Sequence, residues 1–140
     1  MNYATWLPRV GASILDGLLI SIPALLTLPY VLVTANPDGT YTSSGWIAYA
    51  AGALVSLGLT VYNRFLRQGR TGQSWGKSML GIRLVGERTG QPIGAGTAFV
   101  RELAHFVDTL ICYIGYLFPL WDAKRQTVAD KVVKSVVVRG

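Results

Sequence analysis

The sequence predicts an all-α membrane protein, a helical bundle of two full spans plus a third spanning or re-entrant hydrophobic segment. Amphipathic surface helices and a small cytoplasmic β-element are expected to complete the fold. Two observations predict this class. Of the 140 residues, 51% are hydrophobic and only 14% are charged, whereas charged residues make up about a quarter of a typical soluble domain. In addition, no lysine or arginine occurs between Val10 and Asn63.

Two apolar stretches are each long enough to cross a bilayer, which takes about 20 residues. Residues 9–34 form the first predicted span and residues 46–66 the second, with the turn-rich segment 35–45 between them. Pro23 and Pro29 lie inside the first span, where we expect them to kink or divide the helix.

A stripe of small residues follows one face of the second span, because small side chains recur there at every fourth position. Such a stripe allows two helices to approach closely. We expect it to serve packing within one chain, and the alternative is contact with another subunit. The stripe consists of Ala48, Gly52, Ser56 and Thr60.

Residues 67–96 form a polar, glycine-rich loop. Six bases and the single acid Glu87 lie between Arg64 and Arg88, so the positive-inside rule places this loop, and with it the N-terminus, in the cytoplasm. Within the loop, Ser74–Leu80 is expected to form a short surface helix. Residues 82–85 and 91–93 are expected to pair as a hairpin.

The net charge is +6, and the bases lie beside apolar segments. This arrangement favours a bilayer with anionic headgroups as partner over nucleic acid. The residues expected to contact headgroups are Arg67, Arg70, Lys77, Lys124, Arg125 and Lys131.

The third hydrophobic segment, residues 97–121, combines charged and apolar parts. Its charge-free part is short for a span, and the amphipathic tail 122–140 that follows is basic. A single crossing would leave that tail outside, against the charge rule. We therefore favour a bent segment that turns around Gly115 and Pro119 and returns the tail to the cytoplasm, although one full crossing stays open.

An internal repeat is visible in the apolar segments. Arg9–Pro23 aligns with Arg101–Gly115, with Arg, Ala, Asp, Leu and Ile matching in register. Gly72–Val85 aligns in the same order with Arg125–Val138. A degenerate duplication would place both amphipathic turns on one face of the membrane and would allow 82–85 to pair with 135–138. The alternative is chance similarity between short apolar stretches.

These residues resemble the RDD family of small bacterial membrane proteins. Arg9 and Asp16 match the family's arginine and first aspartate, while Gly72–Val85 and Arg125–Lys131 match its two further motifs and identify Asp130 with its second aspartate. The resemblance implies one RDD-type membrane domain over residues 1–140, in the bacterial cytoplasmic membrane. Some members look like cation/proton antiporters, and others look like accessory parts of larger machines.

Charged side chains inside apolar segments are the candidate functional groups, because each costs about 2.5–3.5 kcal/mol at membrane depth. They can form an ion or proton site between helices, or a structural polar network. Arg9 and Asp16 cannot pair along one rigid helix, so each needs a partner elsewhere. The predicted network consists of Arg9, Asp16, Arg101, His105, Asp108 and Asp130.

Other chemistries are not expected. His105, Asp108 and Cys112 share a helical stripe, but one straight helix cannot wrap three ligands round a metal ion. A packed, hydrogen-bonded His105 is expected, with a proton relay to Asp108 as the alternative. Residues 72–78 fall one residue short of a P-loop. No catalytic set is visible, so neither an enzyme nor a cofactor is predicted.

The sequence is compatible with two functions. The first is a proton-coupled transporter of small cations or solutes that works as a homo-oligomer. In it Asp16 and Asp108 would carry protons or ions, and Arg9 and Arg101 would tune them. The second is a non-catalytic accessory or assembly subunit that packs against a larger membrane complex through the Ala48–Thr60 stripe.

Overall fold

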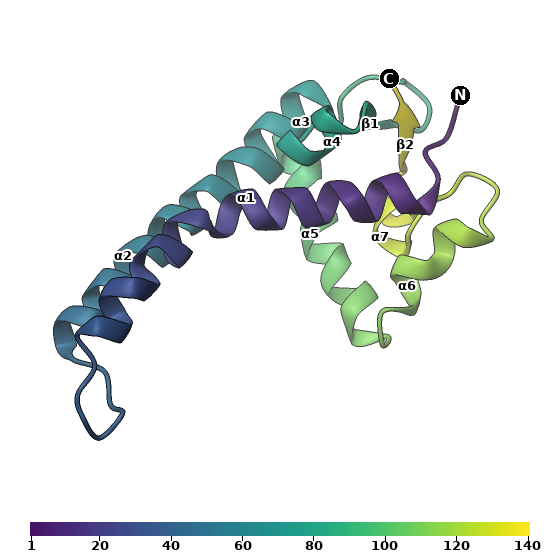
Figure 1. Ribbon diagram of the computed structural model, residues 1–140. Helices are drawn as coiled ribbons and strands as arrows, with labels where there is room; N and C mark the ends of the chain where they lie inside the picture. Colours follow the sequence, from purple (N-terminus) through teal and green to yellow (C-terminus); the bar gives the residue numbers. More distant parts are fainter. The chain divides into compact units, whose positions relative to one another are not determined.

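The computed structural model describes all residues, 1–140, and most of them are helical (Figure 1). The chain forms two compact units. The large unit comprises Met1–Asp16 and Tyr62–Gly140, and the small unit comprises Gly17–Val61. Two helices, Trp6–Val33 and Ser43–Thr71, are long and apolar enough to cross a membrane. The prediction of two helices of this kind is therefore confirmed.

The first of these helices, α1 (Trp6–Val33), runs without a break through Pro23 and Pro29. The expected division of the helix at these prolines does not occur. Each proline removes one N–H from the ladder, and helices in apolar surroundings tolerate such gaps when the rest of the ladder is intact.

The second long helix has three parts. Helix α2 (Ser43–Thr60) begins at Thr42, whose side chain accepts a hydrogen bond from the Gly45 N–H at 3.2 Å. It continues as a π-helical stretch, η1 (Val61–Arg67), and as α3 (Gln68–Thr71). The helix ends at Gly72, whose φ of 77° suits glycine best. It is thus longer at both ends than the predicted span 46–66.

The small-residue stripe packs inside the small unit, where α2 lies beside the second half of α1 (Figure 1). A Cβ atom on Gly52 would lie 2.8 Å from the Pro23 carbonyl oxygen and 3.0 Å from the Ala24 Cα. The expectation of packing within one chain is therefore confirmed at Gly52. At this position the stripe is occupied by α1 of the same chain, so it is not free for a partner subunit there.

The rest of the large unit consists of short elements and one longer helix. In chain order these are α4 (Trp75–Met79), β1 (Ile82–Gly86), α5 (Ala95–Leu110), α6 (Ile114–Leu117), the 3-10 turn η2 (Phe118–Leu120), α7 (Val128–Val132) and β2 (Ser135–Arg139). The small core of this unit gathers around the strands and consists of Ala4, Ala12, Ile82, Leu84 and Val137.

The two strands form one antiparallel ladder in which Leu84 lies opposite Val137. The pairing of 82–85 with 135–138 agrees with the sequence. The expected hairpin between 82–85 and 91–93 is wrong, because 91–93 is not a strand. The Gly86 N–H donates to the Gln91 carbonyl at 2.8 Å, and the next residue, Pro92, has no N–H with which to extend the ladder.

The third hydrophobic segment is sharply bent. Helix α5 and the α6–η2 pair meet at 108°, and the break falls at Cys112 and Tyr113, whose φ angles are 56° and 62°. The expected bend at Gly115 and Pro119 is therefore misplaced. Gly115 has another task, since a side chain there would overlap the buried carboxyl of Asp108.

The proposed duplication has a clear structural counterpart. In the first copy Ser74 caps α4 by accepting from the Lys77 N–H, and in the second Thr127 caps α7 by accepting from the Asp130 N–H. Both helices have five residues, and each is followed by a left-handed residue, Gly81 or Lys134, and then by a strand. The same local structure is thus built twice.

Hydrogen bonds repeat as well as elements. The Gln73 Nε2 donates to the Ile82 carbonyl at 3.3 Å, and the equivalent Gln126 Nε2 donates to the Ser135 carbonyl at 2.8 Å. Leu84 and Val137, which face each other at the centre of the ladder, are themselves equivalent in the repeat. The two copies are therefore related by a local twofold axis through the middle of the ladder.

Candidate functional site

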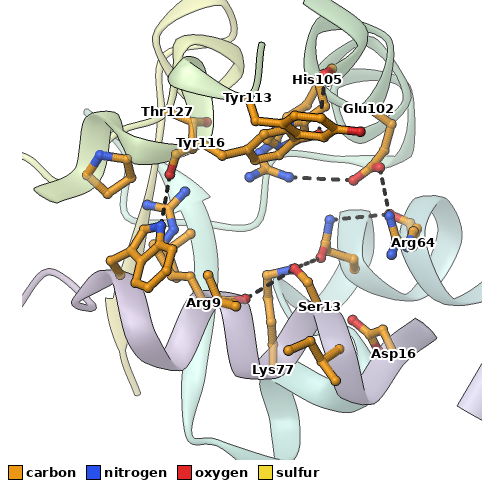
Figure 2. A pocket seen from close by; sticks show the side chains of 17 residues that line it. Arg9, Ser13, Asp16, Arg64, Lys77, Glu102, His105, Tyr113, Tyr116 and Thr127 are labelled. Atoms are coloured by element: carbon orange, nitrogen blue, oxygen red, sulfur yellow. Dashed lines mark hydrogen bonds and ion pairs between the residues drawn. The ribbon is translucent and has the colours of Figure 1, made fainter. Parts of the chain in front are cut away.

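A partly open cavity of about 440 Å³ lies within the large unit (Figure 2). Its size suits a small organic molecule. Charged, aromatic and amide side chains from α1, the η1–α3 segment, α4, α5 and α6 line it. The residues of these kinds that line the cavity include Trp6, Arg9, Asp16, Arg64, Gln68, Lys77, Arg101, Glu102, His105, Tyr113 and Tyr116.

Asp130 is the acid at which two of the cavity's arginines meet. Its carboxylate accepts from the Arg9 guanidinium and, at 2.7 Å, from the Arg101 Nε. It also accepts from the Thr127 N–H at 3.1 Å, which closes the capping box of α7. Burial alone would raise the pKa of Asp130, but the Arg101 and Arg9 guanidiniums outweigh burial and hold this pKa well below its usual range.

A second acid extends this pairing across the cavity. Glu102 has one oxygen 3.5 Å from the Arg101 Nη1 and the other 3.3 Å from the Arg64 Nη1 (Figure 2). Positive and negative groups therefore alternate from Arg9 through Asp130, Arg101 and Glu102 to Arg64. Each arginine of the cavity thus has a carboxylate partner within the chain.

Asp16 has no arginine partner. Its Oδ1 accepts from the Asn63 Nδ2 and from the Gly76 N–H, each at 2.8 Å. The Asn63 Oδ1 accepts in turn from the Trp75 N–H at 2.9 Å. Asp16 therefore joins the start of α4 to the π-helical stretch that holds Asn63, a type of irregularity that is frequent at functional sites.

Lys77 differs from the other bases of the cavity. Its side chain is buried, with 9% of the residue exposed, and its Nζ donates to the Gln68 Oε1 at 2.5 Å. No carboxylate lies within 4.0 Å of this ammonium group. Burial lowers the pKa of Lys77 to about 7; Arg101 adds to this effect and Asp16 opposes it.

The burial of Lys77 corrects its predicted role at the membrane surface. A Cβ atom on the preceding residue, Gly76, would overlap the Ala12 carbonyl, so α4 packs directly on α1 and leaves Lys77 facing the cavity. Sequence periodicity carries no sign of this close approach.

The other residues expected to contact headgroups have varied surroundings. Arg70 is exposed, and its side chain makes no hydrogen bond or ion pair. Lys124 pairs with Glu87, and Lys131 lies 2.6 Å from Asp122. The guanidinium groups of the remaining two donate to backbone carbonyls, at 2.6 Å for Arg67 and 3.3 Å for Arg125.

His105 is packed and hydrogen-bonded, as the sequence predicts. Its Nδ1 lies 2.7 Å from the Asp108 Oδ2, and its ring stacks on Tyr116 with centroids 5.2 Å apart. Asp108 is fully buried beneath α6 and does not line the cavity. Of the two acids expected to carry protons or ions, Asp16 lines the cavity and Asp108 does not. Cys112 is exposed, and no three His, Cys, Asp or Glu side chains gather to hold a metal ion.

Several residues of this site carry no clear signal in the sequence. Asn63 and Gln68 stand at the end of an apolar helix, and uncharged amides there carry no clear signal. Glu102 and Arg64 were visible as charges, but nothing in their spacing pairs them. Tyr113 and Tyr116 reach the cavity only because the chain bends after α5.

The comparisons with known proteins agree with the motifs. The RDD family matches residues 3–134. The "Proline-rich antigen" of Mycobacterium leprae (strain TN) is 40% identical over 153 residues, which cover 96% of this chain and 60% of that protein. The "Proline-rich antigen homolog" of Mycobacterium tuberculosis (strain CDC 1551 / Oshkosh) is 40% identical over 152 residues, which cover 98% and 63% respectively.

This chain thus spans about three fifths of the length of the curated relatives that it matches. No solved structure matches it. The match over nearly the whole chain, together with two helices apolar enough to cross a bilayer, shows that this membrane protein belongs to the RDD family.

Proposed function

We propose that this RDD-family membrane protein is a proton-coupled transporter of small solutes that acts as a homo-oligomer. The observation that supports this proposal is Lys77, a buried amine that faces the cavity and has no acidic partner. Burial brings the pKa of this amine to about 7. Such a group can take up and release a proton near neutral pH, as a coupling site must.

Asp16 supplies the second part of the proposed carrier. It lines the same cavity as Lys77 and is joined to α4 through the Gly76 N–H. Loss of the Lys77 proton would change the charge balance beside Asp16, Arg101 and Glu102, whose charges act on the Lys77 amine. We propose that a bound solute and this proton stabilise each other, which couples their movement.

The membrane arrangement is part of the proposal. The basic loop 67–96 supports a cytoplasmic location for the N-terminus and for the β1–β2 sheet, in a bacterial cell membrane. The 108° bend between α5 and α6 supports a re-entrant segment that returns the basic tail to the cytoplasm. Two full spans are too few to enclose a pathway, so subunits would share one. We propose no enzymatic activity.

Reconstitution into liposomes with a trapped pH-sensitive dye tests this function. Gradients of sodium, potassium, phosphate and benzoate are imposed in turn, and proton movement is recorded. We expect one gradient to drive proton flux with the wild-type chain, and Asp16→Asn and Lys77→Met to lower this flux at least tenfold. Arg88→Gln, which changes an exposed base in the turn after β1, should leave it unchanged.

Two results would contradict transport. One is the absence of flux from every gradient, and the other is full flux in both Asp16→Asn and Lys77→Met. Purification from native membranes provides the complementary measurement. Stoichiometric recovery of an unrelated complex, combined with absent flux, would favour the accessory-subunit hypothesis.

A further inference from the structure

One cation of the cavity has no counter-charge within the chain. The three arginines each have a carboxylate within 3.5 Å, supplied by Asp130 or Glu102. Lys77 has only the neutral amide oxygen of Gln68. A buried ammonium group without an opposite charge is unfavourable, and a carboxylate or phosphate oxygen from outside the chain would remedy this.

The repeat strengthens this argument. Lys77 in α4 occupies the position that Asp130 occupies in α7, three residues after the capping Ser74 or Thr127. In the second copy the acid at this position receives two guanidinium groups. In the first copy the base at the same position receives no acid. The counter-ion is thus built into one copy and missing from the other.

The remaining walls suit an organic molecule. Tyr113 and Tyr116 lie on one side of the cavity and Lys77 on the opposite side (Figure 2). Trp6 lies beside Tyr116, since its indole N–H donates to the Tyr116 carbonyl at 3.0 Å. A cavity with aromatic walls opposite a single cation suits an organic anion. The cation attracts the charged group, and the rings pack on the apolar part.

We propose that the cavity binds a small organic oxyanion, with its carboxylate or phosphate group on the Lys77 ammonium and its apolar part against Tyr113 and Tyr116. This inference rests on the proposed function, because it names the chemical class of the solute. The same oxyanion chemistry can come from a water-soluble molecule or from the phosphate of an anionic lipid.

Binding of such an anion would depend on pH. The Lys77 ammonium carries the positive charge that the anion needs, and its pKa is about 7. The anion should therefore bind more weakly at pH 8.5 than at pH 6. The groups that face Lys77 and influence its protonation are Gln68 on α3, Asp16 and Arg9 on α1, and Arg101 and Glu102 on α5.

Isothermal titration calorimetry on the full chain in detergent tests the site, with benzoate and inorganic phosphate as soluble probes. We expect one probe to bind at least tenfold more weakly at pH 8.5 than at pH 6. Lys77→Met should weaken binding at pH 6 at least tenfold, and Lys77→Arg should restore binding and remove most of the pH dependence. Arg88→Gln, at an exposed base in the turn after β1, is the matched control and should bind as the wild type does.

Anionic lipid as the source of the oxyanion is tested in nanodiscs of phosphatidylcholine with and without phosphatidylglycerol. Lys77-dependent retention of phosphatidylglycerol, without binding of either soluble probe, would support the oxyanion site and identify the lipid as its source. Equal binding by wild type and Lys77→Met, or binding of neither source, would overturn the inference. Restored binding by Lys77→Arg would show that the loss of binding in Lys77→Met comes from the missing charge and not from misfolding.

The two proposals can fail separately. Oxyanion binding at Lys77 without proton flux in liposomes would reject transport and keep the site. Proton flux driven only by sodium or potassium, without oxyanion binding, would keep transport and reject the site.

Discussion

Lys77 and Asp130 occupy the same position in two copies of one motif. Each is the third residue of a five-residue helix, and its backbone N–H donates to the capping hydroxyl of Ser74 or Thr127. Asp130 contacts Arg9 and Arg101, whereas the Lys77 amine contacts a neutral amide. The duplicated motif thus carries opposite charges at equivalent positions, and the acidic copy holds the helices together while the basic copy faces a cavity.

We expect Asp130→Asn to destabilise the large unit strongly. Asp130 is fully buried between two guanidinium groups, and removal of one partner from a buried ion pair costs about 3–5 kcal/mol. Thermal unfolding in detergent, followed by circular dichroism, measures this loss. Asp38→Asn changes an exposed carboxylate in a turn and is the control. An unchanged melting temperature for Asp130→Asn would show that the arginines do not depend on this acid.

Lys77 should make the stability depend on pH. Its pKa is about 7 in the folded chain and 10.5 as a free side chain, so between these values the unfolded chain binds more protons. The free energy of unfolding of the wild type, relative to Lys77→Met, should therefore rise as the pH rises from about 7 to 10.5. Chemical denaturation of both proteins at several pH values measures the difference.

Lys124→Met provides a comparison, because the stability that Lys124 contributes should change with pH in the opposite direction. The pKa of Lys124 is raised by the hydrogen bond to Glu87, so its contribution is full at pH values below 10.5 and is lost above. If the difference in the free energy of unfolding between wild type and Lys77→Met stays constant from about pH 7 to 10.5, Lys77 is not buried as described.

Gly76 should tolerate no side chain. A Cβ atom there would overlap the Ala12 carbonyl, which belongs to backbone and cannot rotate away. Gly76→Ala should therefore separate α4 from α1 and destabilise the protein by about 1–3 kcal/mol, despite the better helix propensity of alanine. Gly96→Ala is the matched control, because nothing lies within 4 Å of its added methyl group. The readout is chemical denaturation. Equal stability of the two variants would disprove the close contact.

The sequence predicts well the features that local pattern determines. The two long apolar helices follow from composition, and the equivalence of the segments around Ser74 and Thr127 follows from their shared residues. The pairing of β1 with β2 could be anticipated only because the repeat placed two similar strands together. Arg9 and Asp130 both belong to the predicted network, and their contact meets the expectation that a buried arginine needs an acid.

The sequence could not predict features that depend on contacts between distant segments. Asp16 is satisfied by an amide and a backbone N–H, groups that have no charge to mark them. The bend after α5 falls on Cys112 and Tyr113, residues without a preference for left-handed φ, while the expected hinge Gly115 packs against Asp108. In each case tertiary packing outweighs the local preference.

Two glycines of α2 provide the last test, because they share one helix and differ in surroundings. A Cβ atom on Gly52 would lie 2.8 Å from the Pro23 carbonyl oxygen, whereas Gly58 has nothing within 4 Å. Gly58→Ala should be neutral or stabilising by up to about 1 kcal/mol, since alanine favours the helix. Gly52→Ala should destabilise the small unit by about 1–3 kcal/mol, because the backbone of α1 must move away. Thermal unfolding of both variants in the same detergent gives the comparison, and a stabilised Gly52→Ala would mean that the stripe does not pack against α1 and is available to a partner.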